Sequence, residues 1–186
     1  MSLTHPLILK ITRSGQPQSW VSSERAAVDL CCDKVAWSFG ESGIVLRGGL
    51  NAQGRRSELA IPAIIATRND SRNDREGIPF TRHNLFARDR WTCMYCGEVL
   101  PVGRLTVDHI LPTSRGGRHV WQNTISACFA CNHFKANRTP EEANMALLGV
   151  PYTPNRFEYL YLKNRHILAD QMDFLSKGFR NLRLSA

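Results

Sequence analysis

Four cysteines stand in two CxxC pairs, and their type and spacing are suited to binding a metal ion. The pairs are Cys93-Met94-Tyr95-Cys96 and Cys128-Phe129-Ala130-Cys131, separated by 31 residues. A two-residue gap lets each pair offer both sulfurs to one ion, and four thiolates satisfy a tetrahedral Zn²⁺. Buried free thiols are the alternative interpretation. The sequence therefore predicts a structural zinc, whose binding free energy would stabilise the segment between the pairs.

The segment between the pairs predicts a strand, a loop, a second strand and then a helix. Residues 105–110 are rich in β-branched side chains, and Pro112 ends the strand. The basic, glycine-containing stretch 114–118 is expected to be a loop. Residues 124–127 form the second strand, which leads into the second cysteine pair, and a helix is expected after Cys131.

The residues carried by these elements resemble those of the HNH endonucleases. Asp108-His109 stands at the end of the first strand, Asn123 precedes the second, and Asn132 directly follows Cys131. This order matches the Asp-His pair, the central Asn and the last His or Asn of that family's ββα-metal fold. The stretch Ser114-Arg115-Gly116-Gly117 and the sequence 135–143 extend the resemblance over about residues 80–150. It implies a zinc-stapled, metal-dependent DNA endonuclease that hydrolyses phosphodiester bonds.

The resemblance implies a role for each of these residues, and their chemistry suits those roles. His109 is the general base, because an imidazole with an unperturbed pKa of about 6.5 can accept a proton near neutral pH. The oxygens of Asp108 and Asn132 suit a catalytic Mg²⁺ or Mn²⁺. The family role of Asn123 is to pin the loop and hold His109 in place. No small-molecule cofactor is expected.

Positive charge is concentrated in the middle of the chain, which indicates a polyanionic partner. The formal net charge is +8, and residues 80–140 hold eight Lys and Arg side chains against three acidic ones. DNA is the expected partner, and we expect backbone contacts from the basic residues Arg115, Arg118, Lys135 and Arg138. The histidines without a partner pattern, which are His83, His119 and His166, are expected on the surface. A solvated face is the alternative for Lys135.

The expected fold class is α+β, with a small N-terminal α+β unit followed by the ββα-metal core and C-terminal helices. The predicted divisions are an N-terminal domain with a linker (1–79), the nuclease domain (80–150) and a helical segment (151–186) that packs on the core or a partner. Before the polar stretch 67–77, strands are expected over 7–11, 35–39, 44–46 and 59–66, and a helix over 23–33. Cys31 and Cys32 are expected to be small buried residues. Further helices are expected from Thr139 to Gly149 and over 155–176.

Several function classes are disfavoured by the sequence. No apolar run is long enough for a membrane helix, no export signal is apparent, and a cytoplasmic location is expected. No HExxH motif is present, which disfavours a metalloprotease. The main alternative to a nuclease is a non-catalytic zinc-ribbon module that binds nucleic acid, and such a module would tolerate alanine at His109. A monomer with one site is expected to nick, whereas cleavage of both strands would suggest a homodimer.

Overall fold

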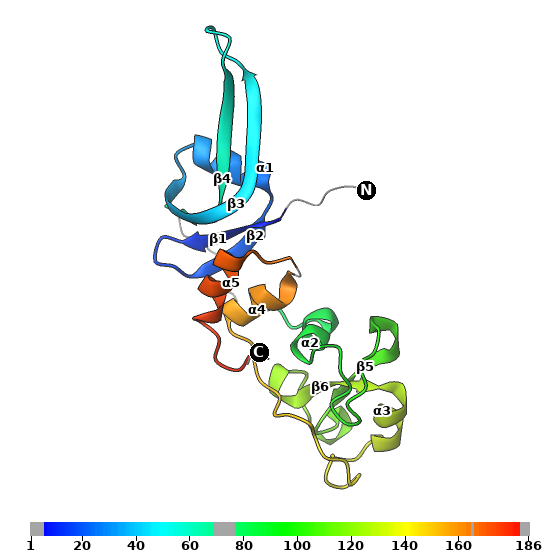
Figure 1. Cartoon of the computed structure of the whole chain (residues 1–186). Coiled ribbons are helices and arrows are strands. Elements are labelled where there is room, and N and C mark those ends of the chain that lie inside the picture. Colours follow the sequence, from blue (N-terminus) through cyan, green and yellow to red (C-terminus); the bar gives the residue numbers. More distant parts are fainter. Residues whose placement is uncertain (1–5, 69–76, 165, 183–186) are drawn as a thin grey trace. The chain divides into compact units, whose positions relative to one another are not determined.

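The computed structural model describes residues 6–68, 77–164 and 166–182. The chain divides into two compact units, one made of Met1–Gly77 with Asn155–Ala186 and the other of Ile78–Pro154. The C-terminal helices therefore lie in the same unit as the N-terminal strands, although the two segments are far apart in the sequence (Figure 1). Within the described ranges, no helix is long and apolar enough to cross a membrane.

A four-stranded sheet is the centre of the first unit, with the order β2-β1-β4-β3. Its strands are β1 (Ile8–Thr12), β2 (Pro17–Val21), β3 (Val35–Leu50) and β4 (Arg56–Thr67). β1 runs parallel to β4, and the other neighbours are antiparallel. The two strands expected over 35–39 and 44–46 are one strand, because the pairing shifts between Glu41 and Ile44 at a bulge. Gly43 allows that bulge with a φ of +72°.

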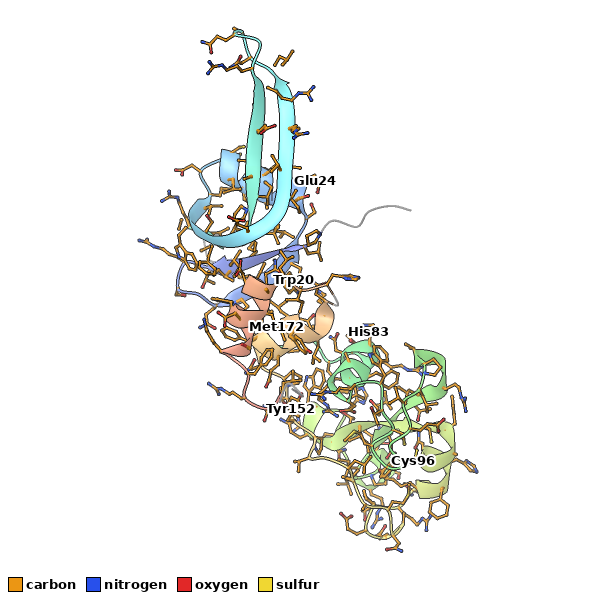
Figure 2. All side chains as sticks on the ribbon, viewed as in Figure 1. Trp20, Glu24, His83, Cys96, Tyr152 and Met172 are labelled. Atoms are coloured by element: carbon orange, nitrogen blue, oxygen red, sulfur yellow. The ribbon has the colours of Figure 1, made fainter. Side chains whose placement is uncertain are left out.

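Helices cover both faces of this sheet. Successive residues of a strand point to opposite faces, so Ile8 packs with α1 (Ser23–Cys31) while Leu9 packs with the C-terminal helices. Leu160 and Leu175 supply the buried contacts from α4 (Arg156–Lys163) and α5 (Ala169–Ser176). The Trp20 indole of β2 also donates a hydrogen bond to the Leu160 carbonyl at 2.9 Å (Figure 2).

Two expectations for this unit are wrong. The single helix expected over 155–176 is interrupted after Lys163, because the Asn164 side chain bonds both backbone groups of His166 and so competes with the helical pattern. The second concerns Cys31 and Cys32, which are exposed at the end of α1. The inward face of that helix presents Ser23, Ala26 and Asp29 instead.

Glu158 is a buried carboxylate that ties α4 to the last described residues. It accepts hydrogen bonds from the backbone N–H groups of Asn155, Arg180, Asn181 and Leu182. Burial alone would raise the pKa of Glu158, but these donors outweigh it and the pKa is lowered. The stabilisation is therefore present above the pKa of the unfolded chain and is lost as the pH falls through the lower folded value.

We expect Glu158→Gln to destabilise the first unit by about 1–3 kcal/mol at neutral pH, because an amide NH₂ cannot accept a backbone N–H. The difference from the wild type should shrink as the pH falls below 4.5, the ordinary value for this group. Thermal denaturation followed by circular dichroism at pH 7, 5 and 3.5 measures both effects. Glu41→Gln, at an exposed position, is the control. A difference that stays constant with pH would contradict this role for Glu158.

The second unit contains a ββα arrangement, so the expected α+β fold class with a ββα-metal core is confirmed. Strand β5 (Leu105–His109) pairs antiparallel with β6 (Thr124–Cys128), and α3 (Phe129–Lys135) follows directly. The register places Leu105 opposite Cys128 and His109 opposite Thr124. The core of the unit combines these strands with α2 (Arg82–Arg88).

A buried arginine and a turn complete this unit. Arg88 donates to the carbonyls of Trp121 and Thr124, and it pairs with Asp89, which in turn accepts from the Ser126 backbone. These bonds fix β6 to α2. The helix expected from Thr139 to Gly149 is wrong, because that stretch forms only turns and Asn144 takes a positive φ of +55° that ends any helical run.

Candidate metal centre and active site

The four CxxC cysteines meet in one cluster, as the sequence predicted. Their Sγ atoms all lie within 4.8 Å of one another, and no other group of three or more His, Cys, Asp or Glu ligands was found among the described residues. A tetrahedral zinc with Zn–S bonds of about 2.3 Å separates its sulfurs by roughly 3.8 Å, so the cluster fits that ion. Gly97 closes the first turn with a φ of +79°, and its N–H bonds the Cys93 carbonyl at 2.9 Å. Figure 2 labels Cys96 in this cluster.

The charge of the four cysteine thiolates favours a cation bound between them. Burial acts to raise the pKa of Cys93, but hydrogen bonds from backbone N–H groups of both pairs lower it to about 7. Burial and the neighbouring sulfurs, Cys128 first, raise the pKa of Cys131. Four thiolates at this spacing repel one another without a positive charge between them. The arrangement therefore suits a structural zinc.

Asp108 is a buried carboxylate at the end of β5, and protein groups hold both of its oxygens. The Tyr95 hydroxyl donates to Oδ2 at 2.7 Å, and Lys135 Nζ donates to Oδ1 at 3.0 Å. Burial and then the Asp108 carboxylate raise the pKa of Tyr95, so its phenol remains a neutral donor. The orientation of Asp108 is thus fixed from two sides.

Lys135 lies inside the unit and not on its surface. Its side chain is 1% exposed, and its Nζ also donates to the His109 carbonyl at 2.7 Å. The position three residues after Asn132 on α3 turns this side chain toward β5. Its Nζ thus bonds two protein groups, Asp108 and the His109 carbonyl, and the side chain also lines the pocket beside them.

Asn132 faces the same strand from the first half of α3. Its Nδ2 donates to the Thr106 hydroxyl at 2.9 Å, which leaves the amide oxygen as the group available to a ligand. Asp108, His109, Asn132 and Lys135 line one shallow pocket of about 280 Å³ with Pro112 and Thr113. The pocket therefore brings together three of the four residues expected to be catalytic.

His109 has a partner that the sequence did not reveal. Its Nε2 lies 2.8 Å from Nδ1 of His119, and the His119 ring packs edge-on against Phe80 with centroids 4.6 Å apart. Burial first, and then His119, lower the pKa of His109, with Asp108 opposing them in part. The two histidines are ten residues apart on either side of a loop, and neither spacing nor composition signals such a contact.

Asn123 organises the loop between the two strands. Its Oδ1 accepts from the Leu111 N–H at 2.9 Å, and its Nδ2 donates to the carbonyls of Leu111 at 3.1 Å and Arg118 at 2.9 Å. A Cβ at Gly117 would collide with the Leu111 carbonyl, so only glycine fits this tight loop. Asn123 does not line the pocket itself, but its bonds fix the residue that precedes His119.

The three remaining basic residues lie on the surface outside the pocket. Arg115 forms a two-pronged ion pair with Glu142. Arg138 bonds the Phe134 and Lys135 carbonyls and lies over the Phe134 ring at 5.2 Å. Arg118 is exposed. Arg115 and Arg138 thus already contact protein groups, whereas the Arg118 side chain bonds no other residue in the described part of the chain.

Comparison with known families agrees with this geometry. Residues 93–148 match the family model for HNH endonuclease. No curated protein matches the chain. The matched segment contains both cysteine pairs, β5, β6, α3 and the pocket that they form. The chain therefore carries a domain of the HNH endonuclease family.

Proposed function

We propose that this chain is a metal-dependent DNA endonuclease that hydrolyses phosphodiester bonds, with residues 80–150 as its nuclease domain. The observation that carries this proposal is the shared pocket of Asp108, His109 and Asn132 within the HNH segment. Phosphodiester hydrolysis needs a base for water and a positive charge beside the phosphate. The pocket offers residues for both tasks.

Asp108 and Asn132 would hold the catalytic cation, for which a carboxylate and an amide oxygen suit Mg²⁺ or Mn²⁺. Such an ion would neutralise negative charge on the phosphate and on the leaving oxygen. Lys135 already places an ammonium at Asp108 Oδ1 and keeps that carboxylate oriented. The cysteine cluster is a different kind of site from this pocket. Its soft thiolates favour zinc, whereas the hard oxygens of Asp108 and Asn132 favour Mg²⁺ or Mn²⁺.

His109 is the proposed general base. It lines the pocket beside Asp108, and its Nε2 forms a hydrogen bond with Nδ1 of His119 at 2.8 Å. With Nε2 as the donor in that bond, Nδ1 of His109 is the nitrogen that can accept a proton. A hydrogen bond to one ring nitrogen fixes the orientation of the other. His119 is accordingly a positioning residue, and its packing on Phe80 holds it in turn.

Replacing His119 with alanine should lower kcat for DNA nicking by roughly 10-fold to 100-fold, with little change in KM, because the base remains present but loses its orientation. His119→Asn keeps a hydrogen-bonding group and should recover part of the rate. Steady-state rates over a range of supercoiled-plasmid concentrations provide kcat and KM. Equal losses for alanine and asparagine, accompanied by a lower melting temperature, would instead indicate a purely structural role.

The proposed function is tested by incubating the purified protein with supercoiled plasmid, with and without Mg²⁺ or Mn²⁺, and by a gel-shift of the same mixtures. Conversion of the plasmid only in the presence of the cation supports the nuclease. A monomer is expected to give nicked plasmid. Linear plasmid, together with a dimer observed by sedimentation, would indicate that a homodimer cleaves both strands. Binding without cleavage of plasmid or of any mixed-sequence duplex would favour the non-catalytic binding module.

A further inference from the structure

The β3–β4 hairpin extends beyond the rest of its sheet. β1 pairs with β4 only from Ile64 to Thr67, so the outer part of β4 has β3 as its sole neighbouring strand. We call residues 47–58 the arm, and every residue in it is exposed. Figure 1 shows the arm as a two-stranded ribbon that leaves the sheet of its own unit.

The tip of the arm is closed by its own hydrogen bonds. The Asn51 side-chain oxygen accepts from the Gln53 N–H at 3.0 Å and the Arg55 N–H at 2.9 Å. The Asn51 N–H bonds the Arg55 carbonyl at 2.8 Å, and Gly54 supplies a positive φ of +73°. A ribbon that buries neither face gains little stability by itself. Because every residue of this ribbon is exposed, the ribbon is suited to contact a partner.

The charge on the arm identifies the chemistry of that partner. The arm carries Arg47, Arg55 and Arg56 against a single acidic residue, Glu58. Arg47 pairs with Glu58 at 3.0 Å, whereas Arg55 and Arg56 have no ion pair among the described residues. Leu50 is the single large apolar side chain on the arm. A polyanion matches this surface better than an apolar protein face does.

We propose that the arm is a second DNA-binding element, which lies in a groove of duplex DNA and places Arg55 and Arg56 on backbone phosphates. A two-stranded ribbon fits the major groove, which is about 12 Å wide. Contacts of this kind add affinity without reading sequence. The inference rests on the proposed function only because it takes DNA as the substrate. It gives the N-terminal unit a role, whereas the proposed function concerns only the nuclease pocket.

The test is binding of a mixed-sequence 30-base-pair duplex, measured by fluorescence anisotropy over a range of KCl concentrations. Cleavage is prevented by making every variant in a His109→Ala background. Arg55→Gln with Arg56→Gln should weaken binding roughly 10-fold near 0.1 M salt and lower the salt slope by about 1.8, because two phosphate contacts are lost. Arg13→Gln with Arg25→Gln removes the same charge from exposed positions of the same unit, outside the arm, and should change affinity by less than about twofold.

The outcomes separate this inference from the proposed function. If the parent protein binds the duplex and the arm and control variants lose affinity equally, the arm inference is overturned while the nuclease proposal stands. A change in sedimentation of the arm variant with unaltered DNA affinity would also overturn it, and would assign the arm to contacts between copies of the chain. If the wild type neither binds nor cuts DNA, the proposed function itself fails. When the two arm substitutions are made in a protein that keeps His109, the KM for plasmid cleavage should rise while kcat stays the same.

Discussion

Replacing His109 with alanine is expected to lower the single-turnover rate of plasmid nicking by about 10³-fold, which is within the usual range for loss of a general base. The expected cause is chemical and not structural. His109 is half-buried at the end of β5, where its side chain bonds His119 and lines the pocket. DNA binding and the melting temperature should therefore stay close to those of the wild type.

His133 provides a matched control, because it lies on α3 near the pocket, is exposed and does not line the cavity. His133→Ala should retain nearly the full rate. An active His109→Ala protein, purified free of contaminating nuclease, would exclude His109 as the base. Equal losses at both histidines would point to general damage of the helix and strand instead.

The second large effect is expected from the cysteine cluster. Cys131→Ser should unfold the unit of residues 78–154 and abolish cleavage, because a zinc held by three thiolates loses much of the binding free energy that stabilises this small core. Cys131 lies in the first turn of α3, and Asn132 is the next residue. Loss of the metal therefore also displaces a proposed ligand of the catalytic cation.

Limited proteolysis and zinc content, measured on the same samples, test this expectation. The 78–154 unit should become protease-sensitive and lose its zinc, while the sheet of the first unit remains protected. Cys31→Ser is the control, since Cys31 is an exposed thiol of the first unit and belongs to no cluster of metal ligands among the described residues. A Cys131→Ser protein that stays folded and cuts DNA at the normal rate would refute the structural role of the cluster.

Local sequence signals predicted the parts of the structure in which neighbours along the chain determine the geometry. The CxxC spacing predicted the cysteine cluster, and the β-branched stretches predicted the pair β5 and β6. The order of Asp108, His109, Asn123 and Asn132 indicated the HNH family, and the matched family model confirms it. These signals are local because knuckles, strands and a helix start each depend on a few consecutive residues.

Contacts across loops could not be predicted in the same way. The His109–His119 pair depends on how the Asn123-pinned loop folds back, and the burial of Lys135 depends on α3 packing against β5. In the first unit, the apolar spacing of 155–176 suited one helix, but the Asn164 side chain supplies alternative backbone bonds. The bulge at Gly43 similarly made one strand resemble two.

The most direct test of the central claim is the rate of plasmid nicking as Mg²⁺ is added to zinc-loaded protein in a mixture otherwise free of divalent cations. We predict no nicking before the addition and a saturable rise afterwards, seen with the wild type and lost with Asp108→Asn. This dependence would place the cutting in the pocket of Asp108, His109 and Asn132. Nicking that is independent of added cation, and equal in the wild type and Asp108→Asn, would contradict the account.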